Sequence, residues 1–244
     1  MENEKKCPYC NDIGQIKFRL PDKKDVPRDK FGNPIEAYSY YTCFCVNNKL
    51  VTKSFNKLHG TQDVTPEDTI KAGKFAGFRN LVLYGDERKF LFLVKATMVL
   101  HANYHHTFEF LNGIELVHKY YVEQAPGIYR SLADLEDKDL VIFVFDASPD
   151  NKAQNTTVLE VVKSRVRMND TTKSVNKERV ERPTWIYSPS IEALEKSKEY
   201  SAGIQQYLEC FERLNLDKYE VPFSLEGAEP SRKRSKLQSN LGKL

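Results

Sequence analysis

The chain of 244 residues lacks any apolar run long enough to cross a bilayer, and its polar start, MENEKK, lacks the apolar segment of a secretion signal. It also lacks a charge bias, because 37 Lys and Arg stand against 34 Asp and Glu, which gives a net charge of +3. These absences argue against a membrane protein, a secreted protein and a uniformly basic nucleic-acid binder. They predict a cytoplasmic protein, in which disulfides between the five cysteines are disfavoured.

Basic charge is concentrated near the end of the chain, where residues 231–244 contain no acid. Without this segment the chain holds 32 basic and 34 acidic residues. We expect residues 226–244 to form a flexible basic tail, and two functions stay open for it: binding of nucleic-acid phosphates or an acidic partner, and simple solubilisation. The candidate nucleic-acid-binding residues are Arg232, Lys233, Arg234 and Lys236.

Four cysteines lie within the first 45 residues, as Cys7-Pro-Tyr-Cys10 and Cys43-Phe-Cys45. Between them, the alternating residues 14–20, the turn cluster 29–34 and the aromatic residues 36–42 predict a β-hairpin that brings the two pairs together. Thiolates are soft ligands, and tetrahedral Zn²⁺ accepts four of them. We therefore predict a structural zinc site in a small module of residues 1–60. A CxxC redox motif, and His59 as a ligand in place of one thiol, remain alternatives.

The rest of the chain alternates between strand and helix patterns. Thr65-Pro66 followed by two acids predicts a helix start. Strands are expected over 81–84, 107–110, 140–145 and 183–187, and helices over 47–58, 88–103, 113–124, 156–169, 191–197 and 202–214. This alternation predicts an α/β domain over 61–225, with a mostly parallel sheet covered by helices on both faces. Functional loops of such a sheet follow the strand ends, here Tyr84 and Phe145.

The segment after Tyr84 departs from a phosphate-binding loop, which has two glycines five residues apart, then lysine, then Ser or Thr. The corresponding residues are Gly85, Asp86, Glu87, Arg88, Lys89, Phe90, Leu91 and Phe92. Only the first glycine matches, because Leu91 and Phe92 replace the lysine and the hydroxyl residue. Asp146 is followed by Ala147, whereas an ATPase has two acids at this position, which hold the metal and activate water. We predict a pseudo-ATPase that has no enzymatic activity and takes no ATP.

Several motifs in this order resemble a known family. They are the two cysteine pairs, the capped helix, LYG at 83–85, FLNGIELV at 110–117, the acid-terminated apolar strand, and RPTWIYS at 182–188. Together they resemble the DnaC/DnaI-type replicative helicase loaders of bacteria and phages. The resemblance implies a small module that grips the hexameric replicative helicase, and a AAA+ domain that engages single-stranded DNA. It also implies a bacterial or phage-infected cell, and copies of the chain assembled on the helicase ring.

The resemblance carries over to only a few residues. Gly85 matches the first glycine of the nucleotide loop, and Asp146 matches one acid of the metal-binding strand. Pro189 stands where the family has a polar sensor residue, and Glu212-Arg213-Leu214 is a poor substitute for an arginine finger. The sequence thus predicts a AAA+-like scaffold that has lost its nucleotide chemistry.

Two other functions stay open: a decoy inhibitor of the helicase or its loader, and a zinc-ribbon nucleic-acid-binding protein without a helicase partner. No catalytic residue is proposed. His101, His105 and His106 are expected at the surface, Cys210 in the core of an amphipathic helix, and Trp185 as a structural residue of a strand.

Overall fold

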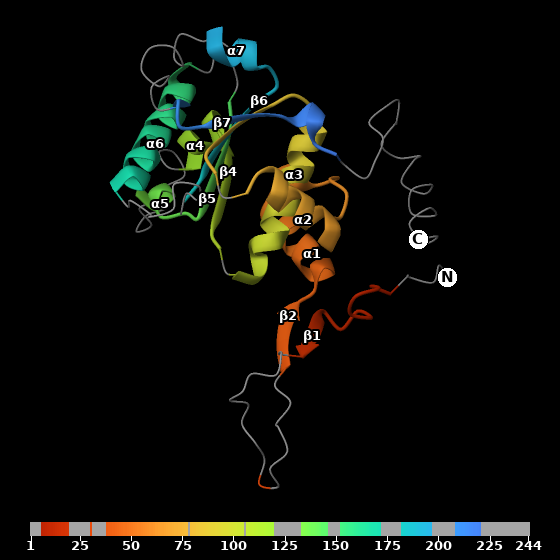
Figure 1. Ribbon diagram of the computed structural model, residues 1–244. Helices are drawn as coiled ribbons and strands as arrows, with labels where there is room; N and C mark the ends of the chain where they lie inside the picture. Colours follow the sequence, from red (N-terminus) through yellow and green to blue (C-terminus); the bar gives the residue numbers. More distant parts are fainter. Residues whose placement is uncertain are drawn as a thin grey trace.

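The computed structural model describes residues 6–19, 30, 38–77, 79–104, 106–119, 133–145, 152–171, 182–196 and 208–220. Strands β1 (Gln15–Arg19) and β2 (Tyr38–Thr42) form an antiparallel hairpin. Five parallel strands form the main sheet, in the order β4 (Phe108–Asn112), β5 (Leu140–Val144), β6 (Thr184–Ser188), β3 (Leu81–Tyr84) and β7 (Glu212–Asn215) (Figure 1). The predicted α/β class is confirmed.

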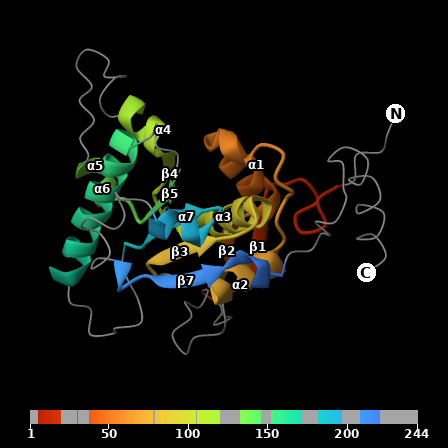
Figure 2. The ribbon, with the colours of Figure 1, turned by 90° about the horizontal axis from the view of Figure 1, so that it is seen from above.

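Helices cover both faces of this sheet (Figure 2). Their bounds are α1 (Phe44–Ser54), α2 (Pro66–Phe75), α3 (Glu87–His101), α4 (Gly113–Val117), α5 (Ala133–Glu136), α6 (Lys152–Thr171) and α7 (Ile191–Lys196), with 3-10 turns η1 (Asn56–Leu58), η2 (Ala102–Tyr104) and η5 (Leu216–Lys218). No helix among the described residues has the length and apolar character needed to cross a bilayer.

Two apolar clusters, one on each face of the sheet, form the core. Leu81, Leu83 and Trp185 pack with α1, α2 and α3 on one face, whereas Val82 and Ile186 pack with α4, α6 and α7 on the other. Because successive strand residues point to opposite faces, the uninterrupted apolar runs of β3 and β5 supply both clusters. Trp185 is fully buried and donates its indole N–H to the backbone oxygen of Arg79, as its structural role requires.

The start of α2 follows the sequence prediction. Thr65 caps the helix, since its hydroxyl accepts from the amide of Asp68 while the Asp68 carboxylate accepts from the amide of Thr65. Pro66 occupies the first turn, where a missing N–H costs nothing.

Two helix predictions are wrong in position. The helix expected to begin at Asn47 begins at Phe44, so that Cys43 is its N-cap and Cys45 lies in its first turn. The helix expected over 202–214 does not include its last residues, because Glu212–Asn215 is strand β7, paired with β3. Cys210 is exposed in the turn before β7, so its predicted place in a helix core is also wrong.

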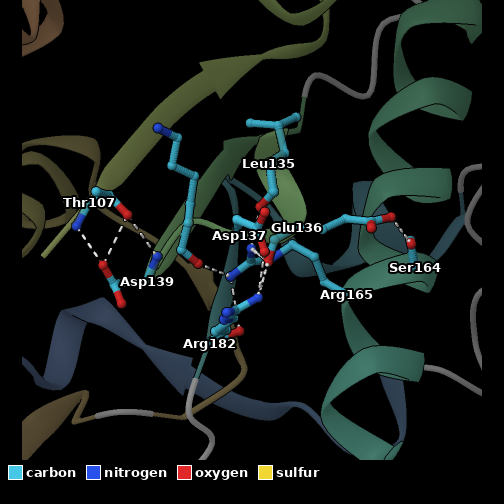
Figure 3. A network of polar contacts seen from close by, with 9 residues as sticks. Thr107, Leu135, Glu136, Asp137, Asp139, Ser164, Arg165 and Arg182 are labelled. Atoms are coloured by element: carbon cyan, nitrogen blue, oxygen red, sulfur yellow. Dashed lines mark hydrogen bonds and ion pairs between the residues drawn. The ribbon is translucent and has the colours of Figure 1, made fainter. Parts of the chain in front are cut away.

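A buried guanidinium holds together the amino ends of β5 and β6 (Figure 3). Arg165 of α6 is only 1% exposed and donates to the Thr184 hydroxyl. It also donates to the backbone oxygens of Leu135, Glu136, Lys138, Arg182 and Pro183. Burial, with a smaller contribution from the nearby charge of Arg182, lowers the pKa of Arg165 to about 10. Hydrogen bonds to neutral oxygens therefore stabilise a charge that is costly to bury.

Candidate metal centre and strand-end loop

The four amino-terminal cysteines converge in space. The Sγ atoms of Cys7, Cys10, Cys43 and Cys45 all lie within 4.8 Å of one another. The Cys7–Cys43 and Cys10–Cys45 sulfur pairs are 3.7 and 3.6 Å apart, and no disulfide joins any of the four. Four thiolates at about 2.3 Å from a tetrahedral Zn²⁺ would have sulfurs about 3.8 Å apart. The cluster thus has the donor set and the spacing of a closed four-sulfur metal site.

A tight turn positions the first pair. The amide of Asn11 donates to the Cys7 carbonyl over 2.9 Å, and Asn11 and Asp12 adopt left-handed φ angles of 49° and 68°. Gly14 follows at φ 80°, and its amide donates to the Cys10 sulfur over 3.4 Å. Asn and Asp tolerate this conformation better than other non-glycine residues, so the NDIG segment after Cys10 is chemically suited to the turn.

The second pair sits at the amino terminus of α1. The Cys43 carbonyl accepts the amides of Val46 and Asn47, and the Cys43 amide donates to the Gly14 carbonyl, which ties the two halves of the site together. The positive end of the helix dipole favours thiolates at this position. The register that the hairpin imposes, in which Gln15 faces Thr42, brings the two pairs to the same end of the hairpin.

The thiols differ in acidity. Burial acts to raise the pKa of Cys10, but hydrogen bonds from the Gly14 amide and the neighbouring thiols outweigh it and lower that pKa to about 7. Burial raises the pKa of Cys43 and of Cys45, and the other thiols raise that of Cys45 further. A bound dication would supply the charge that allows all four to ionise. His59 is exposed in the turn after η1 and does not belong to the cysteine group.

The loop that follows β3 is closed by Asp86, within the loop, and by two side chains from β7 and η5. A single residue, Gly85 at φ 109°, separates the end of β3 from Asp86, whose carboxylate caps α3 by accepting the Lys89 amide over 3.0 Å. A Cβ on Gly85 would lie 3.1 Å from the Asp217 carboxylate and 3.3 Å from the Asn215 amide oxygen. Acidic and polar side chains thus occupy the helix terminus where a phosphate-binding loop presents free amides.

The residues that replace the nucleotide-binding positions belong to the core. Phe90 and Phe92 are buried, and Leu91 packs against the same cluster. Phe90 of α3 stacks on Tyr187 of β6, the strand that pairs with β3, with ring centroids 3.9 Å apart and planes 6° from parallel. The Tyr187 hydroxyl donates to the Gly85 carbonyl over 2.9 Å. Burial, followed by the charges of Glu87 and Asp86, raises the pKa of Tyr187.

Other candidate residues have separate places. Arg213, in the segment compared with an arginine finger, pairs with Glu195. Pro189 is exposed directly after β6. The rings of His101 and His106 stack with centroids 5.0 Å apart, and both residues are partly buried rather than at the surface. Asp146, His105 and the basic residues Arg232, Lys233, Arg234 and Lys236 lie outside the described residues.

A cleft of about 440 Å³ lies between the end of α1, the outer strand β4 and α4. Sequence reasoning did not find it, because its lining comes from segments far apart in the chain. Lys57 pairs with Glu115 across it, and Lys119 Nζ lies 2.6 Å from Glu109 Oε1. In the sequence, one side of the cleft is marked only by the acid-free run of residues 44–57.

No protein-family model and no curated protein matches the chain. Among solved structures, the crystal structure of the DnaI is 10% identical at a TM-score of 0.40, over 66% of this chain and 87% of that one. The crystal structure of Saccharomyces cerevisiae RIF2 is 11% identical at a TM-score of 0.31, over 83% of this chain and 79% of that one. The structural likeness to DnaI is distant. The parallel sheet is consistent with a AAA+-like domain.

Proposed function

We propose that the protein is a helicase loader-like replication factor. It binds the hexameric replicative helicase through the cysteine module and assists its placement on single-stranded DNA without hydrolysing ATP. The observation that carries the proposal is the loader-like order of motifs around a nucleotide loop that Asp86, Asn215 and Asp217 close. A scaffold that keeps the sheet but fills the phosphate position suits a binding role better than a catalytic one.

We propose zinc as the structural metal of the module, held by Cys7, Cys10, Cys43 and Cys45. The metal would fix the hairpin relative to α1, because its ligands come from both. Among the described residues up to residue 60, only Val51 and Leu58 are buried aliphatic residues, so the module depends on such a staple for its fold. The module would then present a rigid surface to the helicase.

Binding energy would replace ATP in the loading step. A protein that binds an open helicase ring more tightly than a closed one shifts the ring population by the ratio of the two affinities. Several copies on one ring would multiply that bias. Each copy contributes only differential binding, so no nucleotide site is required.

The proposal is tested by co-elution of the full-length chain with its cognate helicase, followed by a loading assay on protein-covered single-stranded circular DNA. We expect co-elution, and a rise in unwinding when the chain is added. Unwinding that falls despite co-elution would identify a decoy inhibitor. Absence of co-elution, or tight binding of ATP with Mg²⁺ in a titration, would refute the proposal.

Cys43→Ser tests the role of the module, with Cys210→Ser as the matched control at an exposed cysteine outside the cluster. We expect Cys43→Ser to lose helicase binding and Cys210→Ser to retain it. If both variants retained helicase binding, the cysteine site would not be required for that binding.

A further inference from the structure

The cleft beside β4 contains the outer edge of the main sheet. Among the described strands, β4 pairs with β5 alone and is the end strand of the sheet. α1 and α4 lie on either side of it (Figure 2), and residues 109–111 of the strand line the cleft. The edge of a sheet presents backbone donors and acceptors with which another chain can pair. The cleft therefore offers a backbone surface as well as side chains.

The hydrogen bonds between β4 and β5 show which backbone groups of β4 point outward. The Leu140 amide donates to the Thr107 carbonyl, and Phe108 lies opposite Leu140. Alternate residues of a strand direct their N–H and C=O groups to the same side. Thr107 and Glu109 thus face β5, whereas Phe108 and Phe110 direct their backbone groups away from the sheet. No described residue bonds to the amide or the carbonyl of Phe108 or Phe110.

The open stretch of the edge is short and has a defined end. Asn112, the next residue whose backbone faces outward, donates its amide to the Glu115 carboxylate over 2.8 Å. That bond completes the cap of α4 and would stop an added strand at this point. Phe108 and Phe110 remain open, and together they offer two donors and two acceptors. This set suits a short extended segment.

The lysines and glutamates of the cleft neutralise one another. Lys57 pairs with Glu115, and Lys119 Nζ lies 2.6 Å from Glu109 Oε1. These four side chains therefore give the cleft no excess charge that would attract a strongly charged ligand. Recognition through backbone hydrogen bonds needs no net charge. The charge balance thus favours a peptide of low net charge.

Apolar side chains flank the open edge on both faces of the sheet. Phe55, at the end of α1, lines the cleft and packs against the core cluster of that face. Ile114, at the start of α4, lines it on the other side and is 54% exposed although it is aliphatic. Because successive side chains of a strand point to opposite faces, a strand added beside β4 would direct one toward Phe55 and the next toward Ile114.

We propose that the outer edge of β4 binds an extended peptide segment of a partner protein, which adds to the main sheet as a further strand. Its backbone pairs with Phe108 and Phe110. The segment has low net charge and carries apolar side chains at two neighbouring positions, one against Phe55 and one against Ile114. The inference does not rest on the proposed function, because neither the cysteine cluster nor the helicase takes part in it.

The test selects ligands for the full-length chain from a phage-displayed library of random linear peptides. The enriched peptide is synthesised with a fluorescein label, and its binding is measured by anisotropy. The test variant is Ile114→Lys, which places a charge at the cleft. The control is Ile70→Lys, because Ile70 of α2 is 56% exposed and lies outside the cleft.

We expect enriched peptides of low net charge with apolar residues at neighbouring positions. Ile114→Lys should weaken binding at least about tenfold, and Ile70→Lys should bind as the wild type does. N-methylation of single peptide amides should weaken binding strongly only at alternate positions, because every second amide of an added strand faces β4.

Hydrogen exchange supplies a second measurement on the unsubstituted chain. The amides of Phe108 and Phe110 should exchange at least about tenfold more slowly when the peptide is bound. The Glu109 amide, which faces β5, should be protected in both states. Unchanged exchange at Phe108 and Phe110 would place the peptide elsewhere and overturn the inference.

Four other outcomes would also overturn it. They are a selection that enriches no peptide, enrichment of strongly acidic or basic peptides only, equal binding to the wild type and to Ile114→Lys, and N-methylation effects without a period of two. Self-association of the chain without peptide, measured by sedimentation and abolished in Ile114→Lys, would make a second copy the occupant in place of a partner peptide. The helicase is absent from these assays, so their outcome is independent of the co-elution experiment.

Discussion

Replacing Arg165 by Met should remove the bonds that join α6 to the amino ends of β5 and β6. The guanidinium donates to six oxygen atoms, none of them a carboxylate. Methionine fills a similar apolar volume but donates no hydrogen bond. The variant therefore isolates the effect of the donors from the effect of side-chain volume.

The expected cost follows from the acceptors that water cannot reach. Arg165 bonds to three in buried surroundings, namely the Thr184 hydroxyl and the carbonyls of Leu135 and Pro183. The carbonyls of Leu135 and Pro183 also accept the backbone amides of Lys138 and Val141, so only the Thr184 hydroxyl loses its donor altogether. An acceptor left without a partner costs about 1–3 kcal/mol, and each bond lost at a carbonyl that keeps a partner costs about 0.5–1.5 kcal/mol, which gives about 2–6 kcal/mol in all. A domain of ordinary stability has about 5–15 kcal/mol in all. Arg165→Met should thus lose a large part of the free energy of unfolding. Arg165→Lys should lie between, since an ammonium cannot reproduce the planar fork of donors.

Urea unfolding followed by tryptophan fluorescence measures this loss, because Trp185 is the one tryptophan and is fully buried. Glu160→Met, at an exposed position of the same helix, serves as the control and should change stability by less than about 0.5 kcal/mol. A loss below about 1 kcal/mol for Arg165→Met, with an unchanged denaturant slope, would refute the reasoning.

Two further predictions concern the metal centre and the pH dependence of stability. Elemental analysis should find about one zinc per chain in the wild type and in Cys210→Ser but little in Cys43→Ser, and equal metal content in all three would disprove the site. Burial acts to raise the pKa of Asp139, but hydrogen bonds from the Thr107 amide and hydroxyl outweigh it, so the net pKa lies below its ordinary value. The resulting stability is present above the unfolded-state pKa of about 4 and is lost as the pH falls through the folded-state value. Asp139→Asn should therefore cost about 1 kcal/mol at pH 7 and almost nothing near pH 2, as measured by urea titration at both pH values; a cost that persists near pH 2 would contradict this linkage.

Local chemistry made several elements predictable. The capping pattern at Thr65 and the apolar runs of β3 and β5 act over a few residues, where propensity and hydrogen bonding to near neighbours dominate. The cysteine spacing was equally informative, because four thiolates in two close pairs suit few arrangements other than one shared metal. The loss of the phosphate-binding motif could also be read directly at Leu91 and Phe92.

Long-range pairing decided the features that the sequence pattern misassigned. Residues 208–214 carry apolar side chains three apart, as a helix would, yet Glu212–Asn215 becomes a strand because the edge of β3 satisfies its backbone. In the same way, α1 begins at Phe44 because Cys43 serves as both helix cap and cluster member.

The sequence by itself determined the α/β class, the four-cysteine cluster and the absence of a complete phosphate-binding motif, since each depends on neighbouring residues or fixed spacing. Only the tertiary structure placed Asn215 and Asp217 against Gly85, buried Arg165 among six oxygens, and formed the cleft between the end of α1, β4 and α4. Those arrangements bring together segments more than a hundred residues apart in one case and tens apart in the others, through strand order and helix packing that no local pattern encodes.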